Sequence, residues 1–102
     1  MRIAIAAERP ILEDTVSDGL GRCPYFLLVD TDTMQLTAVR NTAPDVASGL
    51  GIQAAWIVIN QRVSGVIAGE VGRNARRILE GREVKIVTGV SGLTARQAIA
   101  QY

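Results

Sequence analysis

Two apolar runs near the start of the chain are separated by a long polar connection. Residues Arg2–Ala7 and Tyr25–Asp30 each have the length and apolar content of a short buried β-strand. The connection between them, Glu8–Pro24, is rich in turn-forming residues, and one of this length is uncommon in a small domain unless it has a function. Within it, Gly19 and Gly21 allow backbone conformations that are closed to other residues. We therefore expect a shaped loop that contributes to a site.

The pattern after the second strand predicts a hairpin and then a helix. Leu36–Arg40 is a third strand, joined to the second by a polar turn. Apolar residues at helical spacing follow, and they predict the buried face of the helix. These residues are Ile52, Ala55, Trp56, Ile59 and Val63. Ile57 and Val58 lie off this face, so they either form a subunit contact or are covered by loops.

Two more strands and two more helices complete the chain. Gly65–Gly69 and Val84–Val87 are short and apolar, as buried parallel strands are. Thr94 and Gln97 have the spacing of a capping box, which predicts a last helix from Ala95 towards Tyr102. The helix between the two strands is expected to bury three residues, expose three arginines and end at a cap glycine. In that order, these residues are Ala75, Ile78 and Leu79, then Arg73, Arg76 and Arg77, then Gly81.

Composition limits the class of protein. The 102 residues are enough for one domain, 1–102, and 48% of them are apolar. The formal net charge of +1 argues against a nucleic-acid binder that relies on bulk charge. The N-terminal apolar run is too short to cross a bilayer. A single cysteine, Cys23, cannot form an intrachain disulfide, so we expect a cytoplasmic protein.

The order of strands and helices brings several loops to one edge of the sheet. If the first three strands form a meander and the later connections are right-handed, only the second strand is antiparallel. Four loops then emerge at the carboxyl edge: Glu8–Pro24, Asn41–Gly51, Gly69–Gly72 and Thr88–Leu93. Ligands of open α/β sheets bind at this edge, and three helix N-termini there offer N–H groups to an anion. We expect one site, formed by Arg22, Cys23, Ser48, Gly49, Gln53, Gly69, Gly72, Arg73, Asn74 and Ser91.

Several short motifs occur in a characteristic order along the whole chain. They are Ile3–Ala6, Val16–Ser17, Gly21–Phe26, Ser48–Ala55, Val66–Ala75 and Val84–Ile86. Together they resemble the dinitrogenase iron–molybdenum cofactor-binding family. The resemblance implies a ribonuclease-H-like, three-layer α/β/α domain with a five-stranded mixed sheet in the order 3-2-1-4-5. It also implies a carrier of the nitrogenase cofactor or its iron–sulfur precursors, with an assembly protein as partner.

One position departs from the family pattern. Many relatives read Ser-x-His-Phe-Gly-Arg in the first long loop, and that histidine is the natural candidate for a cluster ligand. This chain reads Ser17-Asp18-Gly19-Leu20-Gly21-Arg22 and contains no histidine, so a glycine without a donor atom occupies the position. The charge of an anionic cluster would then be compensated by Arg22 and the helix N-termini.

Cys23 is the remaining candidate metal ligand. A nearby guanidinium would favour its thiolate, which is the form that binds metal. The alternative is that Cys23 is a small buried hydrophobic residue. Because a protein-only iron–sulfur site usually needs several cysteines, any cluster would be shared across a homodimer or held by non-covalent contacts.

The other candidate residues also have structural alternatives. Arg22 either pairs with an anionic ligand or forms a salt bridge with Asp18 or Glu70. Asn74 is either a ligand contact or a polar surface residue. The glycines at positions 49, 51, 69 and 72 either cradle a ligand or serve turns and tight packing, and they do not form a Walker motif.

The sequence favours a binding protein over an enzyme. A chain without histidine has no Ser/His/Asp or Cys/His arrangement. The first strand carries no carboxylates for a nuclease metal site, and Glu70 is isolated. We predict a carrier for an iron–molybdenum cluster, an iron–sulfur cluster or a small anion. The alternative is a structural or regulatory interaction module whose vestigial site binds no metal cluster.

Overall fold

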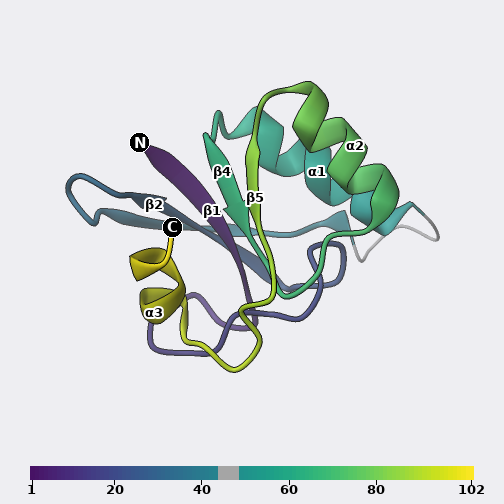
Figure 1. The fold of residues 1–102 in the computed structure, drawn as a ribbon. Coiled ribbons are helices and arrows are strands. Elements are labelled where there is room, and N and C mark those ends of the chain that lie inside the picture. Colours follow the sequence, from purple (N-terminus) through teal and green to yellow (C-terminus); the bar gives the residue numbers. More distant parts are fainter. Residues whose placement is uncertain (44–48) are drawn as a thin grey trace.

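A five-stranded mixed sheet forms the centre of the computed structural model, which describes residues 1–43 and 49–102 (Figure 1). The strands are β1 (Arg2–Ala7), β2 (Tyr25–Asp30), β3 (Leu36–Arg40), β4 (Gly65–Ile67) and β5 (Lys85–Val87). Their order is β3-β2-β1-β4-β5. β2 is antiparallel to both of its neighbours, whereas β1, β4 and β5 are parallel. The α/β class, the strand order and the antiparallel second strand expected from the sequence are confirmed.

Helices cover both faces of the sheet, so the domain has three layers. α1 (Leu50–Asn60) and α2 (Arg73–Gly81) lie together over one face, and α3 (Ala95–Ala100) lies over the other (Figure 1). Alternate residues of β1 enter two separate core clusters: Ala4 packs with the residues of α1 and α2, and Ile5 packs with those of α3. Because β1 is buried on both faces, its sequence is a continuous apolar run.

The last two strands are shorter than the sequence predicts. β4 ends at Ile67 instead of Gly69, and β5 begins at Lys85 instead of Val84. Beyond β4 the backbone bonds to the first long loop, because the Gly69 N–H donates to the Ser17 carbonyl at 2.9 Å. Among the described residues, no helix is long and apolar enough to cross a membrane.

The buried face of α1 differs from the one predicted from apolar spacing. The helix buries Ala54, Ala55 and Val58. Ile52 is 36% exposed and Trp56 is 39% exposed, although both were expected to be buried. Ile57 is partly buried against the same core, so the prediction that Ile57 and Val58 point away from it is wrong. Nearly every residue of α1 is apolar, so spacing alone selects no face, and the two small alanines let the helix lie close to the sheet.

The ends of α2 and α3 give one correction and one confirmation. Gly81 is the last residue of α2, and the left-handed residue that follows the helix is Glu83, with φ of 60°. The prediction of a cap glycine at Gly81 is therefore wrong. The capping box of α3 is confirmed, because Thr94 Oγ1 accepts from the Gln97 N–H at 3.1 Å and Gln97 Oε1 accepts from the Thr94 N–H at 2.9 Å.

Candidate functional site

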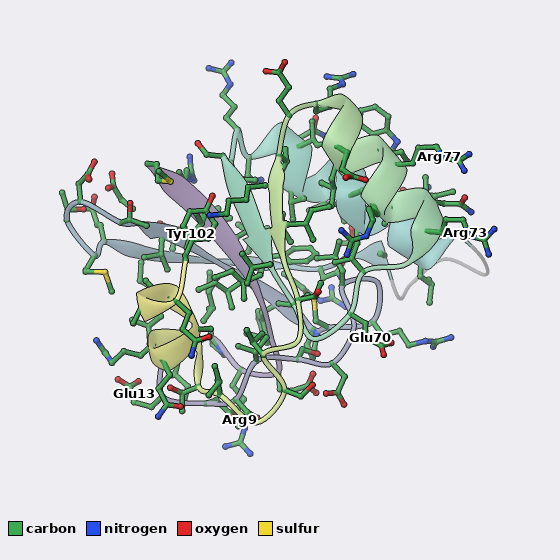
Figure 2. The ribbon with its side chains drawn as sticks, viewed as in Figure 1. Arg9, Glu13, Glu70, Arg73, Arg77 and Tyr102 are labelled. Carbon is green, nitrogen blue, oxygen red and sulfur yellow. The ribbon has the colours of Figure 1, made fainter. Side chains whose placement is uncertain are left out.

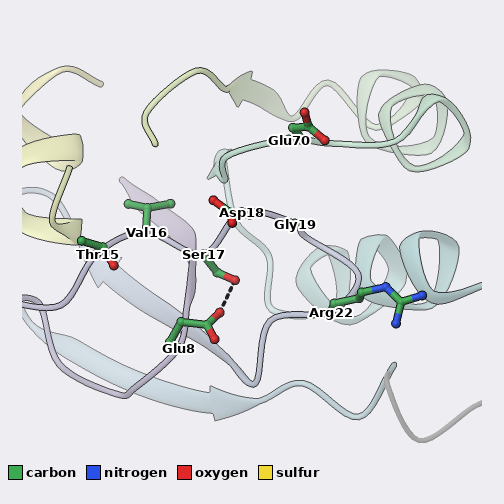
Figure 3. A pocket seen from close by; sticks show the side chains of 8 residues that line it. All are labelled: Glu8, Thr15, Val16, Ser17, Asp18, Gly19, Arg22 and Glu70. Carbon is green, nitrogen blue, oxygen red and sulfur yellow. Dashed lines mark hydrogen bonds between the residues drawn. The ribbon is translucent and has the colours of Figure 1, made fainter. Parts of the chain in front are cut away.

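The first long loop borders an open hollow at the carboxyl edge of the sheet, which we call the loop hollow (Figure 3). It has a volume of about 570 Å³. Three carboxylates line it, from Glu8, Asp18 and Glu70, together with the single guanidinium of Arg22. The side chain of Ser17 is buried there and donates a hydrogen bond to Glu8 Oε2. This hydrogen bond fixes one carboxylate of a mainly acidic wall.

Two further hollows lie on the side of α1 and α2, and the first of them shares Gly19, Arg22 and Glu70 with the loop hollow. The glycine hollow is lined by Gly19–Arg22, Gly49–Gly51, Glu70 and Gly72. The helix hollow is lined by Gly49, Gly51, Ile52 and Gly72–Ala75. The two share Gly49, Gly51 and Gly72. A smaller fourth hollow lies beside α2 and is lined by Gly69–Gly72, Arg76 and Thr88.

Backbone hydrogen bonds hold the first loop against the segment that follows β4. The Glu70 N–H donates to the Asp18 carbonyl at 2.6 Å, and the Leu20 N–H donates to the Glu70 carbonyl at 3.3 Å. This contact requires a glycine at position 69, because a Cβ there would lie 2.7 Å from the Asp18 carbonyl oxygen. The loop is therefore shaped by the backbone, as the sequence predicts, but its partner is the segment after β4.

The second glycine of the loop brings it against the start of α1. A Cβ on Gly21 would lie 2.9 Å from the backbone nitrogen of Gly51. This distance is shorter than the usual contact of a side-chain carbon, so only glycine fits without a shift of the backbone. The close approach places Arg22 at the border between the loop hollow and the glycine hollow.

α1 and α2 both begin at a glycine and have no side-chain cap. Gly49 precedes α1 with φ of 72°, and Gly72 precedes α2 in extended conformation. Neither first turn contains an acidic residue. In the described part of the chain, no acceptor is found for the amides of 50–52 or 73–75. Two helix N-termini thus meet at the glycine and helix hollows, and no described residue accepts from their N–H groups.

The charges divide the site into two halves. The loop hollow is acidic, whereas Arg73 lines the helix hollow and Arg76 lines the fourth hollow. Within residues 1–43 and 49–102, no ion pair joins Arg22 to Asp18 or Glu70, so the salt bridges considered from the sequence are absent there. An anion is therefore favoured on the helix side of the site and repelled on the loop side.

Cys23 lies beneath the site in the hydrophobic core. Its side chain is fully buried, and its thiol donates a hydrogen bond to the Leu20 carbonyl at 3.3 Å. Burial raises the pKa of Cys23 to about 12, so the thiol is protonated at neutral pH. The expectation that Arg22 favours the thiolate is wrong, because desolvation of the buried sulfur outweighs every other effect on its pKa. This position fits the small buried hydrophobic residue, and the metal-ligand role of Cys23 stays a prediction.

The structure brings together six of the ten residues predicted for the site. Those that line the adjoining hollows are Arg22, Gly49, Gly69, Gly72, Arg73 and Asn74. Gln53 and Ser91 are exposed but line none of these four hollows, and Cys23 lies below them. Ser48 lies outside the described residues.

Sequence reasoning missed the acidic half of the site. Glu8, Ser17 and Asp18 belong to a loop that the sequence marks as functional, but they were not selected as site residues. The turn formers of this loop gave no indication of which side chains face the hollow. The nearest signal was Glu70, the single carboxylate in the Gly69–Gly72 segment, which the parallel strands bring to the same edge.

The chain is similar in sequence and in structure to several known proteins. Residues 1–102 match the family model described as dinitrogenase iron-molybdenum cofactor. The apo form of the orange protein from Desulfovibrio gigas is 35% identical, with a TM-score of 0.94 over 98% of this chain and 84% of that chain. A putative NifB protein from Thermotoga is 33% identical, with a TM-score of 0.80 over 97% of this chain and 84% of that chain. Among proteins with curated descriptions, none matches.

A more distant structure shares the fold. A putative dinitrogenase from Methanocaldococcus jannaschii has a TM-score of 0.68 at 15% identity, over 98% of this chain and 85% of that chain. The family model spans every residue, and two similar structures exceed 30% identity over nearly the whole chain. The chain therefore belongs to the dinitrogenase iron–molybdenum cofactor family.

Proposed function

We propose that this protein is a non-catalytic, cytoplasmic carrier whose cargo is an anionic iron–molybdenum or iron–sulfur cluster. The cargo binds in the glycine and helix hollows and is passed to a protein of cluster assembly. The observation that carries the proposal is the pair of uncapped helix N-termini that meet at these hollows. Such termini are a common site for anions, because their amides and dipoles favour negative charge.

The donor groups available favour non-covalent binding. Among the described residues, no group of three or more histidine, cysteine or acidic side chains could hold a metal ion. Backbone N–H groups and arginines match an intact, negatively charged cluster, whose surface sulfides accept hydrogen bonds. Because such contacts release their ligand without breaking a metal–protein bond, they suit a carrier.

Each part of the site has a distinct role in this proposal. Gly49 and Gly72 carry no side chain, so a bulky cargo can approach the amides of both helices. Arg22 supplies positive charge at the glycine hollow and Arg73 supplies it at the helix hollow. Glu8 and Asp18 line only the loop hollow and repel an anion there, whereas Glu70 borders both the loop hollow and the glycine hollow.

The test is an anaerobic titration with isolated iron–molybdenum cofactor and with a synthetic four-iron, four-sulfur thiolate cluster. Charge-transfer absorbance and metal content after gel filtration report retention. We expect the wild type to retain one of the two clusters stoichiometrically. The Gly72→Asp variant places a carboxylate at the start of α2, where a Cβ meets nothing within 4 Å. Its affinity for the retained cluster should be at least about tenfold lower than that of the wild type.

Two matched variants separate this proposal from metal ligation by cysteine. Cys23→Ala removes the only thiol and should retain the cluster like the wild type. Thr94→Ala removes the cap of α3, outside the four hollows, and should also leave retention unchanged. Loss of retention in Cys23→Ala, with normal retention in Gly72→Asp, would assign the cluster to the thiolate. No retention of either cluster by the wild type would refute the carrier function.

A further inference from the structure

The outer face of α1 and α2 combines exposed apolar side chains with arginines. Ile52 and Trp56 are 36% and 39% exposed, one helical turn apart on α1. On α2, Arg73 and Arg77 are exposed and project from the helix in a similar direction (Figure 2). Arg82 follows α2, and its guanidinium carbon lies 5.0 Å from the centre of the Trp56 ring. We call this surface the arginine–tryptophan face; it comprises Ile52, Trp56, Arg73, Arg77 and Arg82.

The contact of Arg82 with Trp56 prepares this face for a partner. A guanidinium over an indole ring is attracted to it. Tryptophan and arginine are also the residues most often found at the energetic centres of protein interfaces. A large exposed aromatic residue beside a cation therefore has the properties of a docking anchor.

The arginines of α2 lie where they do not stabilise their own helix. Arg73 is the first residue of α2, where the helix dipole disfavours positive charge, and Arg76 and Arg77 precede the last turn, where positive charge would be favourable. In the described part of the chain, none of the three forms an ion pair. Near α3, by contrast, Arg9 pairs with Asp14 at 3.3 Å and Arg96 pairs with Glu13 at 2.7 Å. A local arrangement that opposes helix stability indicates a role in recognition.

We infer that an acidic protein surface docks on the arginine–tryptophan face. Charge complementarity selects an acidic partner for Arg73 and Arg77, and the apolar side chains between the helices suit a protein surface. A nucleic acid is disfavoured because the basic patch is limited to Arg73, Arg77 and Arg82, which offer too few phosphate contacts for strong electrostatic binding. The inference rests on the proposed function: Arg73 also lines the helix hollow, so the partner docks beside the cargo it donates or receives.

The test uses a defined acidic probe and two double variants matched in charge. The probe is a helical peptide with glutamates at positions i and i+4 that flank a leucine. Amide chemical shifts of ¹⁵N-labelled protein are followed during titration at physiological ionic strength. We expect shifts confined to α1 and α2, and a dissociation constant about tenfold higher for Arg77→Gln/Arg82→Gln than for the wild type. Arg9→Gln/Arg96→Gln removes the same charge near α3 and should bind like the wild type.

Other outcomes decide against the inference. Equal weakening by both double variants would show attraction by net charge alone. Tighter binding of a single-stranded RNA oligonucleotide than of the peptide, on the same residues, would replace the protein partner with a nucleic acid. Thermal unfolding of each variant verifies the fold, and Trp56→Ala gives an independent test of the apolar anchor. It should also weaken peptide binding, and unchanged binding would contradict the inference.

Failure of this inference can be distinguished from failure of the carrier function. Neither Arg77 nor Arg82 lines the hollows, so the Arg77→Gln/Arg82→Gln variant should retain clusters like the wild type. Cluster retention by the wild type without peptide binding would overturn the docking face and leave the carrier function intact. Peptide binding without cluster retention would support the face and refute the carrier function.

Discussion

The start of α3 is closed by side chains, whereas the starts of α1 and α2 are open. Thr94 and Gln97 satisfy two N–H groups at the start of α3. Gly49 and Gly72 precede α1 and α2, and among the described residues neither helix has a side-chain cap or an acidic residue in its first turn. The same short chain therefore uses efficient capping on one face of the sheet and omits it on the other. In the proposed function a ligand takes the place of the missing caps, because an ordinary cap would have stabilised each helix.

The charged residues repeat this difference. Near α3, arginines pair with neighbouring carboxylates, whereas Arg22, Arg73 and Arg76 border the hollows without an ion pair in the described part of the chain. The α3 face is thus held by its side chains, and the site by close backbone contacts at Gly21 and Gly69. The two regions should respond differently to mutation.

The largest expected effect is at the backbone contact that shapes the site. Gly69→Ala places a Cβ 2.7 Å from the Asp18 carbonyl oxygen, so the loop or β4 must shift. We expect the free energy of unfolding to fall by about 2–3 kcal/mol in urea denaturation. Gly81→Ala is the matched control, because a Cβ at this position meets nothing within 4 Å. The substitution should stabilise α2 by about 0.5 kcal/mol, since alanine favours the helix over glycine. Equal stability of Gly69→Ala and wild type would mean that the contact is looser than described.

The second prediction adds a cap at the start of α2 and removes the cap at the start of α3. Gly72→Asp gives α2 a cap and should raise the free energy of unfolding by about 0.5–1 kcal/mol while weakening cluster retention. Thr94→Ala removes the cap of α3 and should lower the free energy of unfolding by about 1 kcal/mol, with cluster retention unchanged. Chemical denaturation and cluster titration of both variants check this opposition. If Gly72→Asp retained clusters normally, the open N-terminus of α2 would have no role in binding.

The third prediction concerns the pH dependence caused by Cys23. Because burial raises the pKa of this thiol from 9.0 to about 12, the folded state holds the proton more tightly than the unfolded state. Its contribution to stability is therefore complete below pH 9 and is lost as the pH rises from 9 towards 12. The thermal midpoint of the wild type should fall more steeply in this range than that of Cys23→Ala. Reaction of the native thiol with iodoacetamide at pH 8, without unfolding, would contradict this burial.

The smallest expected effect is at the ion pair beside α3. Arg96 donates a hydrogen bond to Glu13 at 2.7 Å, and this bond lowers the pKa of the Glu13 carboxyl. The Arg96→Gln variant should bring that pKa back towards its ordinary value, as measured by NMR titration of the carboxyl carbon. Stability should hardly change, because both side chains are exposed. An unchanged pKa would show that the pair does not persist in solution.

Local sequence patterns predicted most of the fold. The bounds of β1, β2 and β3 follow from apolar runs and turn formers, and the capping box of α3 follows from two residues three positions apart. The parallel order of the later strands follows from the helices between them and the handedness of their connections. These features depend on residues close together in the chain, so the sequence contains the information directly.

The sequence by itself determined the order of the strands, the bounds of the first three and the need for a glycine at Gly21, and it directed the search for a site to the carboxyl edge. Only the tertiary structure decided which face of α1 is buried, because a helix apolar all round has no preferred side until Ala54 and Ala55 meet the sheet. It also placed Cys23 in the core and Glu70 against Asp18. Burial and loop pairing depend on segments distant in the chain, and no local pattern of residues specifies those contacts.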